Sequence, residues 1–97
     1  MFSPLKQYIL EGCYLKKENR INRDLFVDFY GDDSPIKPPA RTKIITQSLE
    51  RLIDRGLMVG YGVRTPKKWF INEVRITRLG VKQWEKFLER NQKKLPI

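Results

Sequence analysis

The sequence predicts an α+β fold that is mostly helical, with three helices, a two-stranded β-hairpin and a C-terminal helix, in that order. Apolar residues recur at helical spacing in four separate segments. Between residues 57 and 76, two short runs of alternating apolar residues flank a basic turn, which is typical of a hairpin. The chain has 97 residues, enough for one small domain. We assign residues 1–92 to this domain and residues 93–97 to a frayed tail.

The first two helices are predicted from their caps and apolar stripes. Ser3 can cap a first helix that ends between Gly12 and Lys17. Gly12 lies within the apolar stripe of this helix, which indicates either a close approach by another element or an early end. Asn22 can cap a second helix that ends at Gly31. The apolar face of this second helix consists of Ile21, Leu25, Phe26 and Phe29.

The third helix, over residues ~40–55, carries most of the functional information. Pro39 suits its first turn, and Gly56 follows its last apolar residue, where a helix end favours a residue tolerant of positive φ. The apolar stripe consists of Ile45, Leu49, Leu52 and Ile53. The opposite face is mostly polar or basic and consists of Lys43, Gln47, Arg51 and Asp54, with Ile44 and Thr46 at its flanks.

The hairpin and the last helix complete the predicted domain. The first strand alternates Leu57, Val59 and Tyr61 with Met58, Gly60 and Gly62. In the second strand, the residues of one parity are Phe70, Asn72, Val74 and Ile76. Thr77 can cap the last helix. The stripe of this helix has two interpretations, an intrachain core in which Trp84 closes over the first helix, or the seam of a homodimer. It consists of Gly80, Trp84, Phe87, Leu88 and Asn91.

This order of elements, with its motifs, resembles the winged helix-turn-helix of the MarR-like type over residues 40–92. In that family the recognition helix ends in a leucine-rich pattern with a basic residue, acidic positions and a glycine. The matching positions here are Leu49, Arg51, Leu52, Asp54, Gly56 and Leu57. The leucine-threonine-x-x-glycine pattern after the wing is matched by Ile76, Thr77 and Gly80. The connection from Gly31 to Pro39 is longer than the ~3–4-residue turn of a tight helix-turn-helix.

Composition favours a polyanionic partner and excludes several classes of site. The formal net charge is +9, which places nucleic acid first and an anionic membrane surface second. Cys13 is the only cysteine and is predicted to be a buried, inert thiol; the chain has no histidine. We therefore expect no disulfide, no metal site, no cofactor and no enzymatic activity. The absence of a signal peptide and of a membrane span predicts a cytoplasmic protein.

The resemblance implies that the chain binds double-stranded DNA, with helix ~40–55 in the major groove and the wing, residues ~63–69, on the backbone. It also favours a homodimer formed through the terminal helices. Guanine can pair with Arg or Lys, adenine with Gln, and a thymine methyl with Ile. The candidate DNA-binding residues are Arg41, Thr42, Lys43, Ile44, Thr46, Gln47, Arg51, Arg64, Lys67 and Lys68. A solvated helix face and an ordinary hairpin tip are the alternative interpretation of these residues. A sequence-specific transcriptional regulator is the first hypothesis; a protein–protein or RNA interaction module within a larger assembly is the second.

Overall fold

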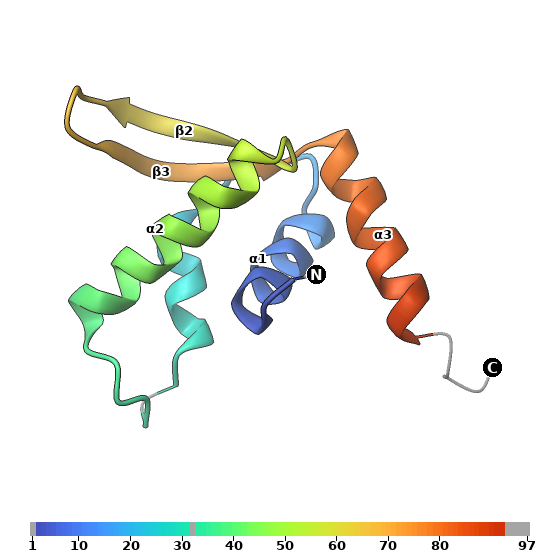
Figure 1. Cartoon of the computed structure of the whole chain (residues 1–97), viewed down its shortest axis with the longest axis horizontal. Helices are drawn as coiled ribbons and strands as arrows, with labels where there is room; N and C mark the ends of the chain where they lie inside the picture. Colours follow the sequence, from blue (N-terminus) through green and yellow to red (C-terminus); the bar gives the residue numbers. More distant parts are fainter. Residues whose placement is uncertain (1, 32, 93–97) are drawn as a thin grey trace.

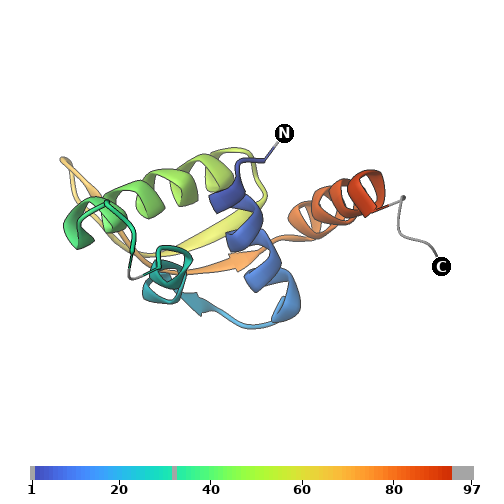
Figure 2. The same cartoon turned by 90° about the horizontal axis from the view of Figure 1, so that it is seen from below.

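A computed structural model describes residues 2–31 and 33–92 and shows an α+β fold that is mostly helical (Figure 1). Its helices are α1 (Pro4–Leu15), the 3₁₀ helix η1 (Arg23–Phe29), α2 (Pro38–Asp54) and α3 (Arg78–Gln92). Its strands are β1 (Ile21–Asn22), β2 (Met58–Arg64) and β3 (Trp69–Ile76). α1 lies between α2 and α3 and contacts both (Figures 1 and 2). The predicted tail, residues 93–97, and the side chain of Asn91 lie outside the described part of the chain.

The sheet has three antiparallel strands in the order β1-β3-β2, so the prediction of a two-stranded hairpin was incomplete. β1 joins the hairpin through the pairs Ile21 with Val74 and Asn22 with Glu73. The sequence does not reveal this strand because two residues are too few for an alternating pattern. Its partners are also some fifty residues away along the chain, and such distant pairing leaves no local signal.

A β-bulge reverses the side-chain alternation within β3. Tyr61 pairs with Glu73, but the next residue of β2 pairs with Ile71, so Asn72 is an extra residue without a partner in the register. Val74 is buried on one side of the bulge and Ile71 on the other. Phe70, which shares the parity of Val74, is 44% exposed. The predicted grouping of Phe70 with Val74 was therefore wrong, since an extra residue moves every later side chain to the other face.

α1 and the second helix form largely as predicted, but the second helix is of a different type. Ser3 caps α1 by accepting a hydrogen bond from the backbone N–H of Lys6 at 3.3 Å. α1 continues past Gly12 to Leu15, so this glycine does not end the helix. Phe26 of η1 packs over it at an ordinary contact distance, since a Cβ atom on Gly12 would lie 3.7 Å from the ring. η1 is a 3₁₀ helix, in which residues three apart share a face. Phe26 therefore points inward, whereas Leu25, which was predicted for the apolar face, is exposed.

One hydrophobic core joins all the helices to the inner face of the sheet. α2 contributes Ile45, Leu49 and Leu52, as its apolar stripe predicts. Cys13 is buried in this core, and desolvation raises the pKa of its thiol to about 12. The chain turns out of α2 at Gly56, whose φ of 78° is the left-handed conformation expected there. Within the described residues, no helix combines the length and the hydrophobicity that crossing a membrane requires.

α3 packs against α1 through the stripe predicted for it. Trp84 is buried, and its ring stacks on Phe87 with centroids 5.2 Å apart. Phe2 lies against both rings. Tyr14 of α1 donates a hydrogen bond to Glu85 at 2.8 Å, which raises the pKa of the Tyr14 phenol. The structure thus uses Trp84 within the chain, as the first interpretation of the stripe predicts.

We expect Thr77→Val to lower the free energy of unfolding by about 1–2 kcal/mol. The Thr77 hydroxyl accepts a hydrogen bond from the N–H of Gly80 at 2.9 Å and donates one to the carbonyl of Gly56 at 2.7 Å. Valine has the same shape and makes neither bond. Urea denaturation measures the change, and Ser3→Ala, which removes one exposed cap bond from α1, serves as the milder reference. Equal stability of Thr77→Val and the wild type would contradict this role.

Candidate nucleic-acid interface

The outer face of α2 presents the polar side chains that the helical period predicts. Lys43, Gln47 and Arg51 follow one another at four-residue spacing and are exposed. Ile45 and Leu49, on the other side of the helix, are fully buried and fix its orientation. Because packing against the core fixes how α2 is turned about its own axis, the three polar side chains face solvent along one line.

The hairpin carries its cations on a short, closed turn. Thr65 and Lys68 exchange backbone hydrogen bonds at 2.7 and 3.3 Å, and the Thr65 hydroxyl bonds the backbone of Lys68 as well. The guanidinium of Arg64 lies 4.6 Å from the ring centroid of Trp69, and the ammonium of Lys68 lies 5.1 Å from that of Phe70. These cation–π contacts restrict two of the cations to positions along the hairpin.

α2 and the hairpin form the two walls of a shared groove, which we call the α2–hairpin groove, with a volume of about 480 Å³. α2 and the hairpin come together near the end of α2 and spread apart toward the start of the helix and the hairpin turn (Figure 1). Three cations and one acid, Glu50, take part in the lining. The lining residues are Arg23, Pro39, Thr42, Lys43, Thr46, Gln47, Glu50, Lys68, Trp69 and Phe70.

Comparison with models of known protein families and with curated proteins finds no match to this chain. Five predicted site residues line the α2–hairpin groove, namely Thr42, Lys43, Thr46, Gln47 and Lys68. Arg51, Arg64 and Lys67 are exposed and do not line the groove; Arg51 follows Lys43 and Gln47 on α2, Arg64 is the last residue of β2 and Lys67 lies in the hairpin turn.

Two predicted site residues have other contacts in the structure. Arg41 is half-buried, and its guanidinium donates hydrogen bonds to the carbonyls of Ile36 at 2.6 Å and Ser34 at 3.5 Å. It thereby ties the connection between η1 and α2 to the first turn of α2. Ile44 is half-buried and packs against the hydrophobic core. Neither side chain lines the α2–hairpin groove.

Arg41→Ala is expected to loosen residues 33–37 and to cost about 1–1.5 kcal/mol of stability, since two carbonyls lose a charged donor. The amides of Ser34 and Ile36, which are hydrogen-bonded within this segment, should exchange with solvent faster. Native-state hydrogen exchange measures both. Arg55→Ala, at an exposed arginine just beyond α2, is the matched control and should leave these amides unchanged.

The tertiary structure adds groove residues that the sequence did not single out as binding residues. Arg23 enters because the pairing of β1 with β3 brings the start of η1 to the groove; its guanidinium lies 3.4 Å from Asp24. Trp69 is half-buried against the core and also lines the groove. A strand of only two residues offered no signal for Arg23.

Charge is divided unevenly between the two parts of the chain. Residues 1–33 hold five Lys or Arg and six Asp or Glu, a net charge of −1. Residues 34–97 hold fifteen Lys or Arg and five Asp or Glu, a net charge of +10. The excess of cations thus belongs to the part of the chain that contains α2, the hairpin and α3. An anionic polymer would be attracted to this part.

Proposed function

We propose that this protein is a winged-helix regulator of transcription that binds double-stranded DNA in a sequence-specific manner. The observation that carries the proposal is the shared groove, in which Lys43 and Gln47 of α2 lie with Lys68 of the hairpin. The net charge of +10 on residues 34–97 supports the same partner, because phosphate contacts dominate the affinity of proteins for DNA.

In the proposed complex, α2 enters the major groove and the hairpin follows the backbone. Gln47 can form paired hydrogen bonds with an adenine, and Lys43 can donate to a guanine. Thr42 and Thr46 offer hydroxyls beside them. Phosphate contacts position the protein without reading sequence. They are made by Arg23, Arg51, Arg64, Lys67 and Lys68. No catalytic step and no cofactor is part of this proposal.

Selection of bound sites from random duplex DNA tests the proposal directly. We expect an enriched motif, and we expect the affinity for that motif to fall with salt at a slope of about −5 if roughly six phosphates are neutralised. A random duplex of equal length is the control. If the selection enriches no motif and duplex affinity does not respond to salt, the proposal fails.

A protein–protein or RNA interaction module is the second candidate, and one observation favours it. The hairpin exposes apolar side chains, with Val63 at 61% and Phe70 at 44%. Such a module would tolerate Lys43→Ala and Gln47→Ala equally well in a duplex-binding assay. In a binding assay with its own protein or RNA partner, both variants of such a module would still bind.

The homodimer and the cytoplasmic location stay predictions. A homodimeric regulator would select a two-fold symmetric motif, because each copy reads one half-site. The terminal helices were predicted to carry the contact, but the stripe of α3 is largely occupied by packing against α1 and Phe2 within one chain.

A further inference from the structure

Glu50 of α2 is the acid that lines the α2–hairpin groove, together with the cations Arg23, Lys43 and Lys68. Its side chain is half-buried. Within residues 2–31 and 33–92, the Glu50 carboxylate makes no ion pair and no hydrogen bond, although three cations line the same groove. A carboxylate that is partly removed from water and has no partner is a ready acceptor for a donor that a ligand brings.

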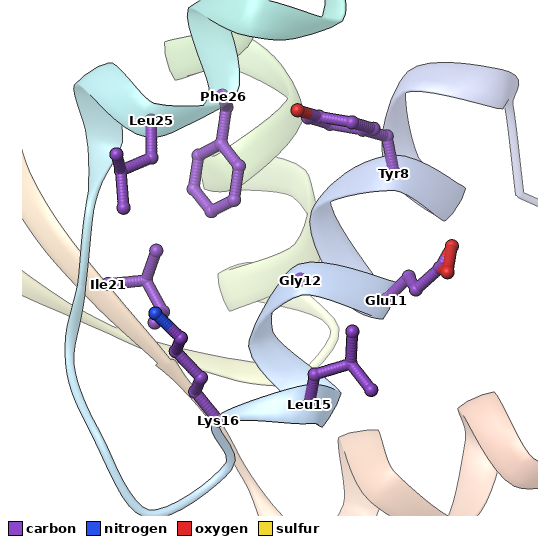
Figure 3. A pocket seen from close by; sticks show the side chains of 8 residues that line it. All are labelled: Tyr8, Glu11, Gly12, Leu15, Lys16, Ile21, Leu25 and Phe26. Atoms are coloured by element: carbon purple, nitrogen blue, oxygen red, sulfur yellow. The ribbon is translucent and has the colours of Figure 1, made fainter.

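Glu11, the acid of a second groove, is a contrasting case. This second groove lies between α1 and η1 and has a volume of about 330 Å³ (Figure 3). Glu11 is exposed, and its side chain points away from Phe26 on the opposite wall (Figure 3). Mostly apolar residues line the rest of this groove. Water can therefore solvate Glu11 freely, whereas Glu50 is half-buried among polar and charged side chains.

Glu50 shares one side of α2 with the two residues to which the proposed function gives base contacts. At 3.6 residues per turn, Lys43, Gln47 and Glu50 fall within an arc of about 60° around the helix. All three line the α2–hairpin groove. The rise from Gln47 to Glu50 along the helix axis is about 4.5 Å, which is close to the ~3.4 Å spacing of neighbouring base pairs. Glu50 can therefore reach the base pair next to the one that Gln47 contacts.

We propose that Glu50 is a specificity-determining residue that accepts a hydrogen bond from the amino group of a cytosine. The inference rests on the proposed function, because it requires α2 to enter the major groove. There, cytosine presents its N4 amino group as a donor, whereas guanine presents two acceptors and thymine presents one. Adenine presents its amino group beside the acceptor N7, which repels a carboxylate. A carboxylate at this position therefore favours cytosine over the other three bases.

The same carboxylate weakens binding to duplexes that lack this cytosine. Glu50 repels phosphate, so the cations Lys43 and Lys68 hold a DNA backbone less tightly than they would without the acid in the same groove. A cytosine at the matching position offsets this repulsion with its amino donor. The difference in affinity between matching and unrelated duplexes increases as a result, because a repulsive group acts against the wrong partners.

Selection from random duplex DNA with the wild type, Glu50→Ala and Glu50→Gln tests the inference. The wild type is expected to prefer cytosine at one position of the motif by roughly tenfold or more. Glu50→Ala should lose this preference and keep the others, and Glu50→Gln should shift it to adenine, with which glutamine pairs. Asp54→Asn is the matched control, since Asp54 is an exposed acid of the same helix that does not line the groove. This control should select the wild-type motif.

Affinities for the wild-type motif and for a scrambled duplex separate base contact from simple charge repulsion. Glu50→Gln and Asp54→Asn each remove one negative charge, so both should bind the scrambled duplex a few-fold more tightly. Glu50→Gln alone should bind the wild-type motif about tenfold more weakly. If the motif contains no such cytosine, or if Glu50→Ala keeps the preference for it, this inference is overturned while the proposed function stands. A wild type that enriches no motif overturns both.

Discussion

Gly80→Ala is expected to lower the free energy of unfolding by about 3 kcal/mol and the melting temperature by roughly 12 °C or more. Gly80 is buried in the first turn of α3, where that turn lies against Leu57 in the connection between α2 and β2. A Cβ atom there would collide with the carbonyl oxygen of Leu57 and lie 2.7 Å from Cγ1 of Ile76. The carbonyl cannot move freely, because it already accepts the N–H of Thr77 at 3.0 Å.

Thermal and urea denaturation of Gly80→Ala measure this effect, with Gly31→Ala as the matched control. A Cβ atom on Gly31 would meet nothing within 4 Å, so that variant should remain within about 0.5 kcal/mol of the wild type. If Gly80→Ala were as stable as Gly31→Ala, the close approach of α3 to Leu57 would be refuted.

Gln47→Ala and Lys68→Ala are expected to weaken DNA binding in two distinguishable ways. Gln47 lies on α2 and can read a base edge, so its loss should cost about 1–3 kcal/mol on the selected site. The cost on unrelated duplexes should be small, and the salt slope should stay the same. Lys68 lies on the hairpin, so its loss should weaken binding to all duplexes and reduce the magnitude of the salt slope by about 1.

Fluorescence anisotropy with the selected duplex and a scrambled duplex, at several salt concentrations, separates these outcomes. Gln83→Ala, at an exposed glutamine of α3, is the matched control for Gln47→Ala and should leave both affinities unchanged. Equal losses on both duplexes for Gln47→Ala would show that α2 contributes affinity without reading sequence. The assignment of Gln47 to a base edge would then be wrong.

Helical features were predictable wherever local chemistry decides the structure. The stripe of Ile45, Leu49 and Leu52 predicted the buried face of α2 and hence the exposure of Lys43 and Gln47. Gly56 likewise predicted the end of this helix, because only a residue without a side chain readily adopts the positive φ found there. These features depend on neighbours three or four residues away in the sequence.

Features of the sheet were harder to predict, because they depend on pairing between distant segments. The extra residue at Asn72 exchanged the environments of Phe70 and Ile71, although both positions read as apolar in the sequence. The pairing of the short strand β1 with β3 likewise depends on distant segments, and it places Arg23 at the α2–hairpin groove. Neither the extra residue nor the pairing of β1 changes the local composition, so no pattern within either segment could predict them.

Local sequence was therefore sufficient for the helices, their caps, the hairpin turn and the excess of cations around them. Tertiary packing decided which of those cations share a surface. It also placed the Arg41 guanidinium on the loop before α2 and Leu15 at the groove between α1 and η1. The physical reason is range: helix caps and periodicity act across a few residues, whereas a groove forms only where separate elements meet.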